Sequence, residues 1–135
     1  MKVSVTPSTP RNKKLRRSDV KDYLDSLQQL ISEALSYNSI SEEARRESAR
    51  LSDDDANEFT RILDSAMRLL GWENQTAANK LRTARPTVAR WRTGRNRPHW
   101  VARPVVISFC IKQLKNKQLE IIKQLELTPG SVEVR

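Results

Sequence analysis

Basic and hydrogen-bonding side chains are concentrated between residues 74 and 98, where two short segments with helical spacing are separated by a three-residue break. The second segment reads Arg-Pro-Thr-Val-Ala-Arg-Trp-Arg and spans residues 85–92. A guanidinium group can donate two parallel hydrogen bonds to a guanine edge or to a phosphate. The spacing predicts helices at about 74–81 and 85–92, of which the second presents its arginines to a polyanion.

The net charge changes sign along the chain, although all 135 residues together carry +9. Residues 1–17 contribute +6, residues 18–71 contribute −6, residues 72–104 contribute +7, and the last part of the chain adds +2. The basic charge therefore lies on the two short predicted helices and on one terminal segment. Such a concentration beside a helix pair is the electrostatic signature of nucleic-acid binding.

Small and apolar residues in this stretch match a known motif by position. They are Ala78, Leu81, Val88 and Trp91. With these residues, the stretch resembles the helix-turn-helix of the lambda-repressor-like family, which includes the Cro and cI repressors. The resemblance implies that Ala78 lies where the two helices touch and that Leu81, Val88 and Trp91 lie in the core. The resemblance covers roughly residues 53–114. It implies that the first helix crosses the DNA backbone and that the second enters the major groove.

One residue departs from the family pattern. Arg82 occupies the turn between the two helices, where the family usually has glycine. Glycine adopts a positive φ without steric cost. The turn must therefore hold an arginine in a costly conformation or take another shape.

Helical register and the resemblance together assign contacts to individual residues. The candidates for reading bases are Ala84, Arg85, Pro86, Thr87, Ala89 and Arg90. The candidates for binding phosphates are Gln75, Thr76, Lys80, Arg92, Arg95, Asn96 and Arg97. For any single arginine, a solvated surface charge is the alternative interpretation.

The N-terminal segment, residues 1–17, mixes prolines, hydroxyl residues and basic residues with few apolar ones. It cannot bury enough apolar surface to become ordered alone, so it is predicted to be a flexible arm. The arm residues that can follow a DNA backbone are Arg11, Lys13, Lys14, Arg16 and Arg17. A solvated tail without a role is the alternative.

The fold is predicted to be all-α. Residues 18–52 contain a helix from about Ser18 to Tyr37, which packs on its own domain or on a partner, and then a polar connector that can hold a charged helical turn. Residues 53–103 form the DNA-binding domain. Their first helix begins with acidic residues that complement its positive end, and it ends at Gly71.

Residues 104–135 contain a long C-terminal helix, to about Leu127, and a frayed tail. Its apolar stripe is interrupted by one polar residue and, at Asn116, by a point where the helix can break. The stripe consists of Ile107, Ile111, Leu114, Ile121 and Leu125, with Gln118 as the interruption. We expect the start of the stripe to belong to the domain core and the helix to form a homodimer contact, with Gln118 in the seam.

No other chemistry is indicated. Cys110 is the only cysteine, which excludes an internal disulfide and is typical of a reducing cytoplasm. No apolar run is long enough for a membrane span. His99 has no acid or nucleophile nearby in sequence, and no metal, cofactor or small-molecule motif is present, so the protein is not expected to be an enzyme.

The sequence is therefore interpreted as that of a double-stranded DNA-binding transcriptional regulator, a repressor or activator of bacterial, phage or mobile-element type. It is expected to act as a homodimer in the cytoplasm, at the nucleoid. One alternative is an accessory protein of replication, recombination or DNA architecture with the same helix-turn-helix. A second alternative is an RNA-binding or protein-interaction module. A palindromic site favours the regulator, and arrayed sites favour the accessory protein. A preference for RNA over duplex DNA favours the second alternative.

Overall fold

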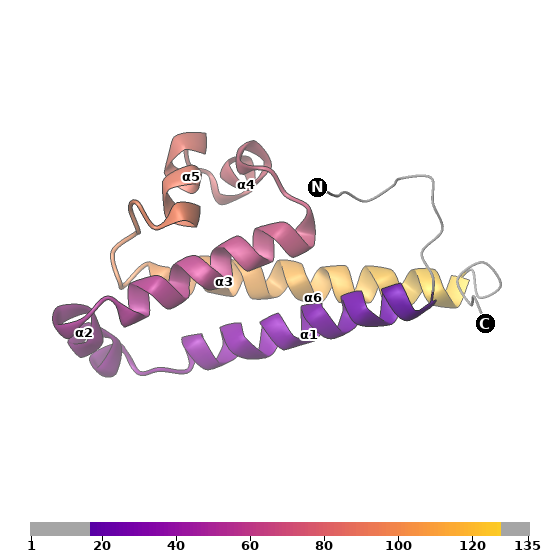
Figure 1. Ribbon diagram of the computed structural model, residues 1–135, viewed down its shortest axis with the longest axis horizontal. Coiled ribbons are helices and arrows are strands. Elements are labelled where there is room, and N and C mark those ends of the chain that lie inside the picture. The colour runs from indigo at the N-terminus through magenta and orange to yellow at the C-terminus, as the bar shows by residue number, and fades with distance from the viewer. Residues whose placement is uncertain (1–16, 128–135) are drawn as a thin grey trace.

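The computed structural model describes residues 17–127, which form six α-helices and no β-strand, so the all-α prediction is confirmed. The helices are α1 (Arg17–Asn38), α2 (Glu42–Leu51), α3 (Asp54–Leu70), α4 (Asn74–Leu81), α5 (Arg85–Thr93) and α6 (Arg103–Leu127). The long helices α1, α3 and α6 pack side by side, and the short helices α4 and α5 lie over α3 (Figure 1). None of the described helices has the length and apolar composition to cross a bilayer.

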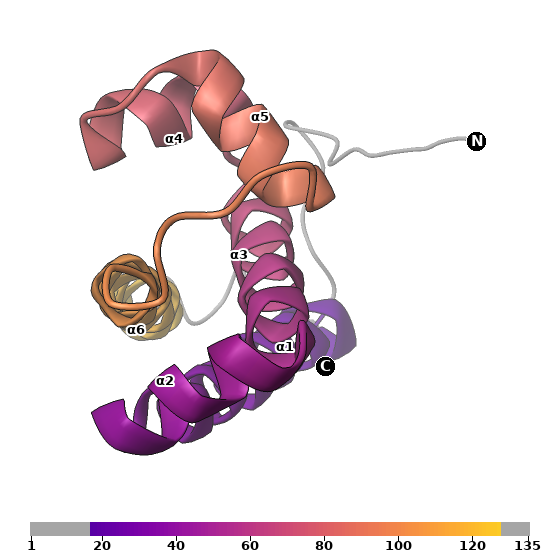
Figure 2. The same ribbon diagram turned by 90° about the vertical axis from the view of Figure 1, so that its left-hand side faces the viewer.

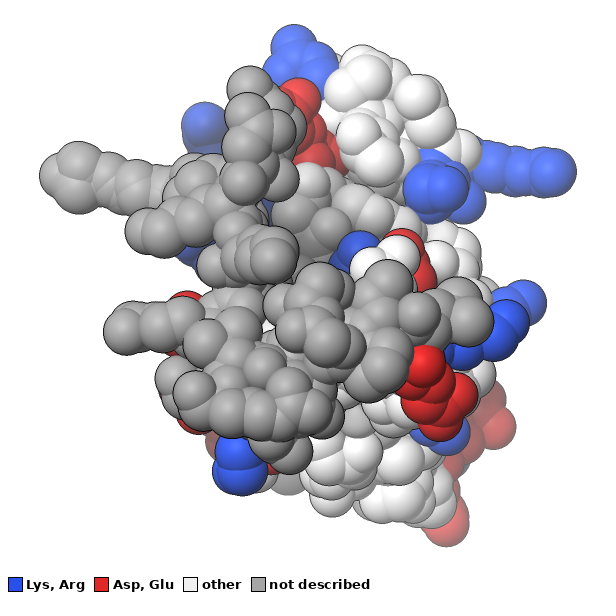
Figure 3. All heavy atoms as spheres, turned by 90° about the vertical axis from the view of Figure 1, so that its right-hand side faces the viewer, with Lys and Arg blue, Asp and Glu red and all other residues white. Residues whose placement is uncertain are grey.

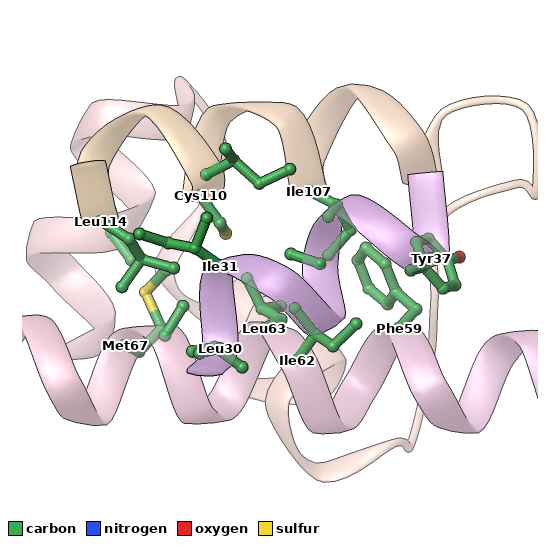
Figure 4. Packing of buried hydrophobic residues seen from close by; sticks show 14 of the residues in the cluster. Leu30, Ile31, Tyr37, Phe59, Ile62, Leu63, Met67, Ile107, Cys110 and Leu114 are labelled. Atoms are coloured by element: carbon green, nitrogen blue, oxygen red, sulfur yellow. The ribbon is translucent and has the colours of Figure 1, made fainter. Parts of the chain in front are cut away.

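The core lies between the three long helices. α1 and α6 run antiparallel, because Asn38 Nδ2 near the end of α1 donates to the Pro104 carbonyl near the start of α6, at 3.1 Å. From α3, Phe59 and Leu63 point into the seam between them and are fully buried (Figure 4). The cluster also contains Cys110 of α6. Each buried side chain of leucine size stabilises the fold by about 1.5–3 kcal/mol.

The apolar stripe of the C-terminal helix packs within its own chain. Ile107 and Leu114 are fully buried against α1 and α3, and Gln118 Nε2 donates to Gln28 Oε1 of α1 at 3.0 Å. The expectation that Gln118 faces a second copy is therefore wrong, since α1 already occupies that side. The helix also runs unbroken through Asn116. The helix retains three exposed apolar side chains, Val105 near its start and Leu119 and Ile122 in its second half.

The polar connector contains a complete helix, α2, rather than a single charged turn. Ser41 caps it, since the Ser41 hydroxyl accepts from the Ala44 N–H at 3.1 Å. Glu42 and Glu43 lie in the first turn, where the positive end of the helix favours them. Arg45, on the inner side, is only 2% exposed. The Ser-Glu-Glu start was the signal in the sequence that marks this helix.

A buried carboxylate joins α2 to the rest of the molecule. Asp55, expected to be a helix-end charge, accepts from Arg45 Nη1 at 2.5 Å and from Arg103 Nη1 of α6 at 2.7 Å. The Tyr37 hydroxyl of α1 donates to the same carboxylate at 3.2 Å. Burial, as the largest cause, and the neighbouring Asp55 charge raise the pKa of Tyr37, so its hydroxyl remains a donor. Asp55 therefore connects four helices.

Most of the predicted arm lies outside the described residues, and so does the predicted frayed tail. The arm residues outside are Arg11, Lys13, Lys14 and Arg16. Arg17 is the first residue of α1, so the helix begins at the last residue of the predicted arm, one residue before the expected start at Ser18.

Candidate nucleic-acid interface

The two short helices have the bounds that the sequence predicts, within one residue. α4 and α5 are joined by residues 82–84 and pack closely. Ala77 and Ala78 of α4 and Val88 of α5 are fully buried, and the two alanines leave room for the neighbouring backbone. Figure 2 shows this α4–α5 unit on one side of α3, with α1 and α2 on the other. The unit therefore stands out from the three-helix core.

The turn takes the first of the two forms expected for it. Arg82 adopts the left-handed conformation, with φ 57° and ψ 49°, and the next N–H, that of Thr83, donates to the Ala78 carbonyl at 2.9 Å. This is the conformation that glycine adopts without cost, and a residue with a Cβ is disfavoured there by about 1–2 kcal/mol. The left-handed conformation of Arg82 keeps the connection short but lowers the stability of the fold.

Packing on α3 fixes the inner side of α5. The Trp91 ring meets Phe59 edge-on, with centroids 6.2 Å apart. Arg92 Nε donates to Asp64 Oδ1 at 2.8 Å, and its Nη1 donates to Asn74 Oδ1 of α4 at 2.9 Å. Arg92, expected to bind phosphate, is thus a residue that ties α5 to α3 and α4, with only 17% of its side chain exposed. Its partners explain the difference, since Asp64 and Asn74 hold its guanidinium against the protein.

The charge of Asp64 is favoured by its surroundings. Burial alone raises its pKa, but hydrogen bonds from Arg68 and Arg92 outweigh that effect and lower the pKa below its usual range. Asp64 is therefore ionised at neutral pH, where it continues to hold Arg92.

Arg97, also expected to bind phosphate, is turned toward α3. Its Nη2 donates to Asn57 Oδ1 at 2.7 Å, and its Nε donates to Thr60 Oγ1 at 3.3 Å. Both partners are neutral, so the positive charge of Arg97 is not cancelled. Two donors of Arg97 therefore face the protein rather than solvent.

The residues predicted to read bases remain accessible. Arg85 and Arg90 are exposed, and neither side chain makes an ion pair or hydrogen bond with another described residue. Ala84 and Pro86 are also exposed, while Thr87 and Ala89 are half-buried. α5 therefore presents two exposed arginines without partners among the described residues, Arg85 at its first position and Arg90 in its last turn.

The remaining phosphate candidates divide between the two ends of the α4–α5 unit. Gln75 is exposed on α4 and donates to Asn79 Oδ1 at 2.9 Å, and Thr76 beside it is half-buried. The Lys80 ammonium is exposed and lies 5.5 Å from the centroid of the Trp72 ring. Beyond α5, Arg95 and Asn96 are exposed.

Basic side chains project from the part of the surface that α4 and α5 form, at the upper edge of Figure 3, whereas most of the visible acidic side chains lie lower. Arg82, Arg85, Arg90 and Arg95 are all exposed, and within the described residues no carboxylate pairs with them. An unneutralised basic surface of this kind attracts a polyanion.

The residues that hold the unit in place were not found from the sequence. Asn57, Thr60 and Asp64 form one row along α3, at spacings of three and four residues. The helical spacing alone places them on a common side. Their arginine partners lie 28 to 40 residues away, so no local pattern identifies the pairs.

Comparisons with protein-family models, with curated proteins and with solved structures found no match to this chain. The likeness to the lambda-repressor-like family therefore depends on the motif residues alone.

Proposed function

We propose that the protein is a sequence-specific regulator of transcription that binds double-stranded DNA and reads the major groove with α5. The observation that carries this proposal is the contrast between the two sides of α5. Its inner side is fixed by Val88 and Trp91, while Arg85 and Arg90 are exposed and without partners among the described residues. A rigid helix with free arginines suits bidentate recognition of guanine.

The dimensions of α5 suit this role. The major groove is about 12 Å wide and admits one α-helix with its side chains. α5 has nine residues, and its first turn contains Pro86, whose missing N–H breaks no helical hydrogen bond there. Arg85 therefore stands at the end of the helix that enters the groove first in a helix-turn-helix.

Phosphate contacts are assigned to a smaller set than the sequence suggests. Gln75, Lys80, Arg95 and Asn96 are exposed and lie on α4 or just after α5. Arg92 is excluded from the set because its side chain is only 17% exposed and is bonded to Asp64 and Asn74. Contacts on both sides of α5 would fix its position along the DNA.

We further propose a homodimer, formed through the C-terminal helix, that acts at the nucleoid in the cytoplasm. One short recognition helix reads few base pairs, and a two-fold dimer doubles the site. Leu119 is 62% exposed and Ile122 is 42% exposed on the outer surface of α6, so they replace the buried stripe as the contact residues. Sedimentation of the wild-type chain and of a Leu119→Asp/Ile122→Asp variant tests this; a monomeric wild-type chain contradicts it.

Selection of bound sequences from a random duplex library tests the function. The wild-type chain is expected to enrich one palindromic sequence. Arg85→Ala/Arg90→Ala should abolish the enrichment. Arg46→Ala, which removes an exposed arginine of α2, should leave it unchanged.

Each other outcome of the selection has a distinct meaning. Arrayed sites without a palindrome would identify an accessory protein of replication or recombination. Stronger binding of RNA than of duplex DNA in a competition titration would contradict the proposal, and so would the absence of any enriched sequence.

A further inference from the structure

Residues 94–102 join α5 to α6, and the C-terminal cap of α5 holds the first end of this segment. Gly94 adopts φ 79°, a conformation that suits glycine. The N–H groups of Arg95 and Asn96 both approach the Arg90 carbonyl, at 3.0 and 3.4 Å. The segment then leaves α5 and passes α3 on its way to α6 (Figure 2). Its first residues are therefore placed by the helix itself.

The second end is held by one side chain of α6. Arg103 Nε donates to the Pro98 carbonyl at 2.9 Å. The same guanidinium donates through Nη1 to Asp55 Oδ2 at 2.7 Å, and the Arg103 side chain is 12% exposed. Because the guanidinium is planar, fixing one edge on a buried carboxylate also fixes the direction of Nε–H. Asp55 and Arg103 thus set the position of Pro98.

Between these two fixed ends lie Arg95 and Asn96, and the side chain of the next residue, Arg97, is bonded to Asn57 and Thr60. Exposed loop residues normally lose conformational freedom when they bind, which weakens affinity. Here the backbone on both sides is already held. The segment is therefore preorganised, with two polar side chains directed to solvent.

We propose that Arg103 is a positioning residue for DNA binding, which braces the 95–98 segment so that Arg95 and Asn96 meet the phosphate backbone without prior ordering. This inference rests on the proposed function. Arg103 itself touches no DNA. Its effect passes through the Pro98 carbonyl, and its own position depends on Asp55.

The arrangement of Asp55 offers a matched pair of variants. Arg103→Met removes the bond to Pro98 and keeps the apolar stem, while Asp55 retains Arg45. Arg45→Met removes the other arginine, while Asp55 retains Arg103 and the segment retains its brace. Neither variant leaves Asp55 without a cationic partner. A difference between them therefore reports on the brace and not on the buried carboxylate.

The first measurement needs no DNA. Hydrogen–deuterium exchange is followed at Val101 and Ala102, whose N–H groups donate to His99, the residue that directly follows the 95–98 segment. Arg103→Met should speed exchange there at least severalfold, and Arg45→Met should not. The second measurement is affinity for duplex DNA. Arg103→Met should weaken binding about three- to tenfold, equally for preferred and random sequences, as expected for lost preorganisation of one or two side chains.

Arg103→Lys is the conservative variant and also guards against a folding defect. Its single ammonium can bind Asp55 or Pro98 but lacks the planar fork, so it should restore only part of the affinity. Unchanged exchange and affinity in Arg103→Met would overturn the proposal and leave Arg103 as a packing residue. An equal loss in Arg45→Met would also overturn it. If the wild-type chain binds no DNA, the proposed function fails, while the exchange data still decide whether Arg103 braces the segment.

Discussion

The three-helix layer of α1, α3 and α6 differs from the α4–α5 unit in length and in burial. The long helices have 22, 17 and 25 residues and supply most of the core, whereas α4 and α5 have eight and nine residues and contribute three fully buried side chains. Isolated helices shorter than about 12–15 residues are marginal in water. The short helices therefore depend on α3 for their shape, and their outer sides are free to carry charge.

Arginines illustrate the same division. Arg45 of α2 and Arg103 of α6 are bound to a buried carboxylate of α3, and Arg92 joins the unit to α3. Arg85 and Arg90 of the unit are exposed. One residue type thus stabilises the fold at one set of positions and remains available for a ligand at another. Burial and partners, not residue type, separate the two roles.

The largest expected effect is a loss of stability, which should differ between a buried and an exposed leucine of α1 in the three-helix layer. Leu30→Ala should lower the free energy of unfolding by about 2–5 kcal/mol, because Leu30 is 4% exposed in the core. Leu35→Ala, on the same helix but at a position 47% exposed, should change it by no more than about 0.5 kcal/mol. Chemical denaturation measures both. Similar losses would contradict the assignment of α1 to the core.

The next largest effect is a loss of DNA binding, expected at the outer side of the α4–α5 unit. Arg85→Ala should cost about 1–3 kcal/mol of binding free energy on the preferred DNA site and relax the preference at one base pair, without lowering thermal stability. Titration of single-base variants of the site measures it. A uniform loss on every sequence would make Arg85 a phosphate contact instead.

Arg95 and Arg97 are expected to behave differently despite their closeness. Each phosphate contact contributes about 0.9 to the slope of log affinity against log salt. Arg95→Ala should therefore flatten the slope by about that amount, whereas Arg97→Ala should leave it unchanged, since Arg97 is bonded to α3. Equal flattening would mean that Arg97 leaves Asn57 and Thr60 when DNA binds.

The smallest expected effect is a gain of stability at Arg82, in the turn between α4 and α5. Arg82→Gly should stabilise the fold by about 0.5–1 kcal/mol, because relief of the left-handed strain is partly offset by the greater freedom of glycine in the unfolded chain. Thermal denaturation measures the change. Thr83→Gly, one residue along and outside the left-handed conformation, is the control and should destabilise. Destabilisation by Arg82→Gly would show that the arginine side chain contributes more than the strain costs.

Helix positions were largely predictable because apolar spacing and end signals are local. The bounds of α4 follow from its register, and the end of α3 follows from Gly71. The partner of the α6 stripe was not predictable, since a stripe indicates that something covers it but not whether that is α1 or a second chain. Tertiary contact alone decides this.

The candidate site was predictable in its residue types but not in their individual roles. Arg85 and Arg92 are both basic residues of one short helix, and only the position of Asp64, 28 residues before Arg92, separates them. Likewise, nothing near Arg45 in the sequence indicates burial, because its carboxylate is on another helix, ten residues away. Pairing of charges across helices is a property of the folded chain.

The accessibility of the Cys110 thiol reports on the opening of the core. It is the chain's only thiol, it lies at the junction of α6 with the core, and it is fully buried (Figure 4). Burial raises its pKa to about 12, so at neutral pH the folded protein presents neither an accessible sulfur nor a thiolate. A thiol reagent can therefore react only when the core around Cys110 opens, so the rate of labelling measures how often that opening occurs.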